Sequence, residues 1–213
     1  MSKMVPRRVV FNAGDLSLEG MLHHREDSSA LEEAARGAIV CHPHPQFGGD
    51  MNNNVVVAVA RALPEKDFMT LRFNFRGVGG SQGVHAGGEK EGDDVLAAIA
   101  YLQPMVNKLF LVGYSFGALV GLRAALQSPE VKGWVAIAPP IGFYDFSYLK
   151  TCPKPKLLLA GKEDPFCPAQ GITTLYESLQ EPKSICLIPD TDHFFWGKET
   201  ILAQEVVSFL KKL

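Results

Sequence analysis

The sequence lacks the marks of a disulfide-bonded, membrane-spanning or nucleic-acid-binding protein. Its four cysteines, Cys41, Cys152, Cys167 and Cys186, include no Cys-x-x-Cys pair, so we expect neither a disulfide nor a zinc framework but small buried hydrophobic residues. No run approaches the roughly 20 apolar residues of a membrane span. The net charge of −2 gives no electrostatic attraction to nucleic acid or to an anionic membrane. Neither is therefore predicted as a partner.

A targeting signal is also absent from the sequence pattern. The amino-terminal stretch carries Lys3, Arg7 and Arg8, but the apolar run at 9–12 is too short for a signal peptide. We therefore expect a cytoplasmic protein, and the sequence leaves a homo-oligomer open. With 213 residues, of which 46% are hydrophobic and 21% charged, one globular domain over 1–213 is expected.

Apolar runs and helical patterns alternate along most of the chain. We expect strands at 7–12, 16–24, 38–41, 70–75, 110–112, 133–138, 156–161 and 184–188. Helices are expected at 53–63, 89–102, 169–179 and 199–213, with another after residue 115, and the polar segment 25–36 is expected to be a surface loop.

This order predicts an α/β fold. The first two strands flank a turn signal at 13–15 and should form an antiparallel hairpin at the sheet edge. The rest should give a mostly parallel central sheet of about eight strands, with helices on both faces and functional groups at the carboxyl ends of the strands. Only 139–155 separates two of the strands, which is too short for a cap domain.

The stretch 110–121 organises the chain. A buried strand leads into Gly113-x-Ser115-x-Gly117, and small residues then begin a helix. This is the nucleophile-elbow pattern, in which a serine sits on a strained turn and its neighbours lack bulk. Ser115 is therefore the predicted nucleophile.

A serine hydroxyl needs a base to remove its proton, and histidine is the usual one. His193 follows the last strand and fits the chain order nucleophile, acid, histidine; the alternative is a structural histidine that caps the last helix. Asp164 follows the strand at 156–161 and is the preferred acid. The rival carboxylates are Asp145, Glu163, Asp190 and Asp192.

The tetrahedral intermediate needs backbone N–H donors. One should come from Phe116, directly after the nucleophile. The second should come from the loop at 42–49, where two prolines have no N–H, which favours the His44 amide over that of Gln46. His42 and His44 read alternatively as packing residues or a metal pair, but Gln46 and Phe47 stand where a metallohydrolase motif needs Asp and His.

Two arginines and a glycine-rich loop lie near the same edge. Arg72 and Arg76 could bind an anionic substrate, although structural hydrogen bonds are the favoured reading. The segment 77–82 departs from the dinucleotide-binding glycine pattern, so its glycines are expected to shape a turn beside the active site.

With these motifs assembled, the chain resembles the α/β-hydrolase superfamily, particularly its short lidless bacterial members described as predicted hydrolases or serine esterases. Dienelactone hydrolases are looser relatives. The resemblance rests on HPHPxxGGxMxN at 42–53, RFNFRGVGxSxG at 72–83, GxxD at 161–164 and DHFF at 192–195. It implies a triad of Ser115, Asp164 and His193 with no metal or organic cofactor.

The expected function is hydrolysis of small acyl esters through an acyl-Ser115 intermediate, with a small-molecule acyl compound as partner. Alternative functions are a thioesterase, a serine peptidase or an acyltransferase that uses the same triad. A catalytically silent binding protein with this fold is a further alternative. An open cleft is expected, with an apolar acyl pocket formed by Phe47, Tyr114, Phe143 and Phe194.

Overall fold

The computed structural model describes residues 4–25 and 36–213. Most of the loop predicted at 25–36 lies outside these ranges. The strands are β1 (Met4–Ala13), β2 (Leu16–Arg25), β3 (Arg36–Cys41), β4 (Phe68–Phe73), β5 (Lys108–Tyr114), β6 (Val131–Ile137), β7 (Lys156–Gly161) and β8 (Lys183–Ile188). The helices are α1 (Asn54–Ala62), α2 (Glu91–Leu102), α3 (Phe116–Gln127), α4 (Ala169–Ser178) and α5 (Glu199–Leu210).

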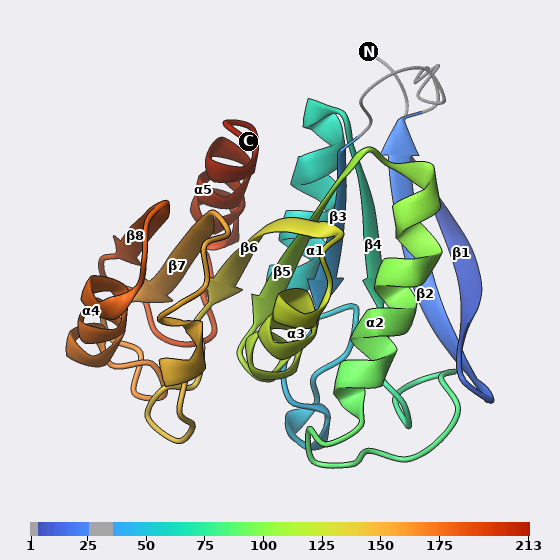
Figure 1. Ribbon diagram of the computed structural model, residues 1–213, viewed down its shortest axis with the longest axis horizontal. Coiled ribbons are helices and arrows are strands. Elements are labelled where there is room, and N and C mark those ends of the chain that lie inside the picture. The colour runs from blue at the N-terminus through green and yellow to red at the C-terminus, as the bar shows by residue number, and fades with distance from the viewer. Residues whose placement is uncertain (1–3, 26–35) are drawn as a thin grey trace.

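The strands form one eight-stranded sheet in the order β1-β2-β4-β3-β5-β6-β7-β8. β1 and β2 pair as the predicted antiparallel edge hairpin, and β2 also runs antiparallel to β4. All strands from β3 to β8 are parallel to their neighbours. Their carboxyl ends therefore meet at one edge of the sheet, the lower edge in Figure 1, where the predicted site residues lie.

Helices cover both faces of the sheet (Figure 1), with α2 and α3 packed together on one face and α1 and α5 together on the other. The central strands β3 and β5 are buried after their first residues, as their continuous apolar runs require. α3 follows central strand β5 and is buried nearly all round, including the run from Phe116 to Leu122. Its small residues allow this close contact with the sheet.

Three cysteines, Cys41, Cys152 and Cys167, are buried, Cys186 is half-buried, and all four are free thiols. This agrees with their expected role as small apolar residues. Among residues 4–25 and 36–213, no helix has the length and apolarity needed to cross a membrane.

Element boundaries depart from the prediction by a few residues. β4 ends at Phe73, not at residue 75, because Phe75 donates its N–H to Nε2 of His42 and no longer to a strand. α2 begins at Glu91, and Glu89 lies before it. α5 ends at Leu210, after which the last residues form a turn. The segment between β6 and β7 contains turns and a 3₁₀ helix at Ser147–Leu149, and so no cap domain stands over the sheet edge.

Candidate active site

Ser115 occupies a strained turn between β5 and α3. Its φ of 53° and ψ of −116° lie where a residue with a Cβ seldom goes. Its own N–H donates to the carbonyl of Ile137 on β6 at 2.9 Å, and its carbonyl accepts from Ala118 at 2.9 Å. These bonds hold the turn from both sides, and Oγ of Ser115 meets Nε2 of His193.

The two glycines of the motif are required by close packing. A Cβ at Gly113 would lie 2.5 Å from Cα of Ala118, and one at Gly117 would overlap the carbonyl oxygen of Cys41. Both obstacles are backbone atoms, which cannot move aside like the end of a flexible side chain. Only glycine therefore lets α3 turn back over β5 and β3 this tightly.

Ser115, His193 and Asp164 form one chain of hydrogen bonds. Nε2 of His193 is 3.0 Å from Oγ of Ser115, and Nδ1 of His193 is 2.7 Å from Oδ2 of Asp164. All three side chains are largely buried. A carboxylate at Nδ1 places the proton there, so Nε2 is free to accept the serine proton.

Asp164 is held in place through its second oxygen. Oδ1 accepts the N–H of Phe166 at 2.8 Å and that of Cys167 at 2.9 Å, so the buried carboxylate has partners on both oxygens. Two rivals are occupied differently: Asp145 is exposed and accepts from the amide and hydroxyl of Ser147, and Asp192 accepts the N–H of Phe194. Among the rival carboxylates, none is hydrogen-bonded to His193 within the described residues.

Two contacts fix the loop that carries His193. Tyr114, next to the nucleophile, donates its hydroxyl to the His193 carbonyl at 2.8 Å. Asn54 at the start of α1 donates its amide to the Phe194 carbonyl at 3.0 Å. The histidine is therefore positioned from β5 and from α1, and it does not cap the last helix, which begins at Glu199.

The predicted oxyanion donors lie on neighbouring segments. Phe116 is the first residue of α3, where an amide has no partner in its own helix. The ring centroids of His44 and Phe116 are 4.8 Å apart. The Gln46 amide is already donated to Nδ1 of His44 at 3.2 Å. In the described part of the chain, the amides of Phe116 and His44 have no hydrogen-bond acceptor.

His42 is part of the frame of this loop. Its Nε2 accepts the Phe75 N–H at 3.1 Å, so its proton is on Nδ1 and is donated to the Pro43 carbonyl at 2.7 Å. Burial lowers the pKa of His42 to about 4, so the ring is neutral at neutral pH. The described residues hold no group of three or more metal-ligating side chains. His42 therefore has the packing role that the sequence analysis gave as one alternative for this histidine.

Aromatic side chains lie beside His193 and beside the residues next to the triad. Phe47, Phe143 and Phe194 are exposed by 86%, 68% and 49%. We call these three, together with the partly exposed Phe166, the aromatic rim. Phe166 contacts the ring of His193 at 4.9 Å and that of Phe143 at 5.9 Å, while Phe194 lies 5.7 Å from His193.

Two side chains differ from the sequence-based expectation for the pocket. Tyr114 is only 2% exposed, because it packs inside the elbow and donates its hydroxyl to the His193 carbonyl. Phe166 was missed, although its place two residues after Asp164 was a usable signal.

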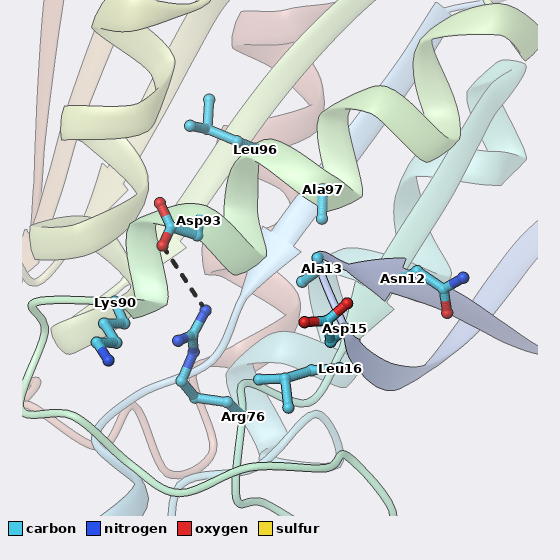
Figure 2. Close-up of a pocket in the computed structure, with 10 residues that line it drawn as sticks. Asn12, Ala13, Asp15, Leu16, Arg76, Lys90, Asp93, Leu96 and Ala97 are labelled. Atoms are coloured by element: carbon cyan, nitrogen blue, oxygen red, sulfur yellow. Dashed lines mark ion pairs between the residues drawn. The ribbon is translucent and has the colours of Figure 1, made fainter.

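The two arginines are tied up in structural bonds. Arg72 donates to the Met51 carbonyl and to Oδ1 of Asn52, each at 2.7 Å. Arg76 forms a buried ion pair with Asp94 at 2.7 Å. Figure 2 shows Arg76 at a groove between the β1–β2 turn and the start of α2, beside Lys90 and Asp93. None of the triad residues lines this groove.

Comparisons with known proteins bear on the family and the fold. Residues 48–152 match the family described as serine aminopeptidase, S33, and residues 118–213 match that of the PhoPQ-activated pathogenicity-related protein. The uncharacterized protein RP471 of Rickettsia prowazekii is 34% identical over 95% of this chain and 88% of its own length.

Two solved structures are similar over almost the whole chain. ATU1826, a putative α/β hydrolase from Agrobacterium tumefaciens, is 37% identical with a TM-score of 0.85, covering 97% of this chain and 95% of that one. XC6422 from Xanthomonas campestris, an α/β serine hydrolase without a lid, is 33% identical with a TM-score of 0.85, covering 97% and 94%. The chain therefore belongs to the α/β-hydrolase superfamily, among its serine hydrolases without a lid.

Proposed function

We propose that the protein is a carboxylic-ester hydrolase that works through an acyl-Ser115 intermediate. The observation that carries this proposal is the continuous hydrogen-bond chain from Oγ of Ser115 through the His193 ring to Asp164. A serine in such a chain can lose its proton to the imidazole as it attacks, which is the requirement for a serine nucleophile at neutral pH.

The proposed reaction has two halves. Oγ of Ser115 attacks the acyl carbon while Nε2 of His193 takes its proton, and the amides of Phe116 and His44 stabilise the oxyanion. The ester C–O bond then breaks, His193 returns the proton to the leaving alcohol, and the acyl group remains on Ser115. A water molecule attacks the acyl-enzyme by the same proton route, releasing the carboxylic acid and restoring the serine.

Asp164 stays ionised during both halves. Its Oδ2 accepts the Nδ1–H of His193, which keeps Nε2 directed at the serine and stabilises the imidazolium that forms. The two backbone N–H bonds to Oδ1 keep the carboxylate from rotating away.

The aromatic rim supports a substrate with an apolar acyl group. Exposed phenylalanine side chains beside a reactive centre gain free energy when an apolar group covers them. The segment between β6 and β7 is short and builds no lid, so a site without a lid suits small acyl groups better than long lipid chains. Thioesters fit the same site, and the serine aminopeptidase family model makes amides the next substrates to compare.

The test is steady-state hydrolysis of p-nitrophenyl acetate, butyrate and octanoate by the wild type and by Ser115→Ala. We expect wild-type turnover that is highest for the short apolar acyl groups, and a loss of at least about a thousandfold in kcat for the variant. Matched thioesters and amino-acid anilides would reveal a different preference. A variant that kept a tenth or more of the wild-type rate would refute Ser115 as the nucleophile.

A further inference from the structure

A second carboxylate–histidine pair lies beside the triad. His85 is on the glycine-rich loop before α2, and Glu91 is the first residue of that helix. Nδ1 of His85 is 2.7 Å from Oε1 of Glu91. Nδ1 is buried and has no regular hydrogen-bond partner among the described residues. The carboxylate and the imidazole are therefore in direct contact.

Glu91 is fully buried, and its carboxylate secures the loop that carries His85. Oε1 accepts the Ala86 N–H at 2.7 Å, and Oε2 accepts the Gly88 N–H at 2.8 Å. Burial raises the pKa of Glu91, but the N–H groups of Ala86 and Gly88 and the His85 ring outweigh it, so the pKa lies below its ordinary value. An ionised carboxylate thus stands directly behind His85 at neutral pH.

The ring of His85 contacts the two segments that carry the proposed oxyanion donors. Its centroid lies 5.1 Å from that of His44 and 5.5 Å from that of Phe116, both in edge-on geometry. The His44 and Phe116 rings also contact each other. The three rings form one cluster, and two of its members contribute the N–H groups on which the oxyanion would rest.

Oxyanion donors act only if they are held in place before the reaction, since donors that must reorganise lose much of their effect. The His44 segment is a single turn of 3₁₀ helix with exposed residues at Gln46 and Phe47. Backbone bonds within that turn do not connect it to α3. The His44 and Phe116 rings make that connection directly, the His85 ring packs against both of them, and Glu91 lies against the His85 ring.

We propose that Glu91 and His85 are positioning residues that hold the His44 and Phe116 segments at the spacing the oxyanion requires. The proposal rests on the ester-hydrolase function given above and deepens it. Neither side chain is assigned a contact with substrate. The groove in Figure 2 is not proposed as a ligand site, because its buried arginine, Arg76, is already paired with Asp94.

The test compares Glu91→Gln and His85→Ala with the wild type on p-nitrophenyl butyrate, well below the melting temperature of each. We expect kcat to fall about tenfold to a hundredfold, less than the 10²–10³ seen when a donor is lost outright. KM should stay within about threefold, because the oxyanion exists only in the transition state. Glu89→Gln is the matched control, since Glu89 is exposed on the same segment.

Two further readouts separate positioning from general stability. A trifluoromethyl ketone, whose hemiketal oxygen occupies the oxyanion hole, should bind both variants at least about tenfold more weakly. The double variant should lose no more than the worse single variant, because the two residues act as one unit. If Glu91→Gln does not fold, kcat and ketone affinity are measured on His85→Ala alone, and the same results decide the proposal.

The outcomes for the two proposals are distinct. Wild-type activity with unchanged kcat and ketone affinity in both variants would overturn the positioning role and leave the hydrolase intact. Losses that appear only in melting temperature, or that add independently in the double variant, would also overturn it. A wild type that neither turns over esters nor binds the ketone would refute the hydrolase itself, and the positioning role with it.

Discussion

At the scale of single residues, Asp164 decides whether the hydrogen-bond chain works as a triad. Its Oδ2 faces His193, and its Oδ1 is anchored by two backbone N–H groups. An amide of the same shape would keep the anchor only with its oxygen toward those donors, and its NH₂ group would then face Nδ1. The imidazole would be driven to the wrong tautomer, with its proton on Nε2.

Asp164→Asn should therefore lower kcat by about 10³ to 10⁴ with little change in fold. Steady-state kinetics together with a circular dichroism melt would measure both effects. Asp145→Asn is the control. Asp145 is exposed, and its carboxylate accepts hydrogen bonds from Ser147 and none from His193 among the described residues. If Asp145→Asn showed the large loss instead, the acid would be misassigned.

Much of the triad could be predicted from the sequence, because parallel strands bring their carboxyl ends to one edge and Ser115, Asp164 and His193 each follow a strand. The supporting contacts could not. The Tyr114 bond to the His193 carbonyl joins residues far apart in the chain, and the approach of His85 to His44 depends on how two loops fold over α3. Local patterns carry no information on such loop paths.

At the scale of elements, the crossing of β5 by α3 depends on Gly113. Gly113→Val should destabilise the protein by about 3 kcal/mol, because the new side chain meets Ala118 and Gly117 backbone atoms. Chemical denaturation would measure the loss. An unchanged denaturation midpoint would contradict the close approach.

Gly92→Ala is the matched control for that substitution. Gly92 lies in α2, and a Cβ there would meet nothing within 4 Å. Alanine is the better helix former, so this variant should be more stable by roughly 0.5 kcal/mol. Opposite signs for the two glycines would separate the steric effect from the loss of backbone freedom.

The existence and order of the elements were predictable, whereas their ends were not. The runs of apolar residues in β5 and β7 are long enough to identify buried strands. The end of β4, in contrast, is set by the bond of Phe75 to His42, and Glu91 at the start of α2 turns back to bind the loop before it. Such ends are fixed by side chains from elsewhere in the fold.

At the scale of the whole molecule, buried neutral histidines make stability depend on pH. Burial lowers the pKa of His42 to about 4, and burial together with Arg72 and Arg61 lowers that of His23 to about 4. Between pH 4 and 6.5 the unfolded chain binds protons at these positions that the folded chain excludes. The free energy of unfolding therefore rises with pH over this window. The contribution of these two histidines to stability is lost as the pH falls through the same window.

For His42 the loss between pH 6.5 and 5 should be about 2 kcal/mol. Urea unfolding at these two pH values, on the wild type and on His42→Gln, would measure it. The variant should be less stable at pH 6.5 because the flexible glutamine cannot replace both hydrogen bonds of the rigid ring, yet its stability should fall less on acidification. An equal fall in both proteins would show that His42 takes a proton without cost.

The central claim is that Ser115 is activated by His193 and Asp164. The most direct measurement is the intact mass of the wild type and of Ser115→Ala after treatment with a fluorophosphonate, which reacts with activated serines. We predict one adduct on the wild type and none on the variant. A folded wild type that gains no adduct, or a variant that is labelled as the wild type is, would contradict the claim.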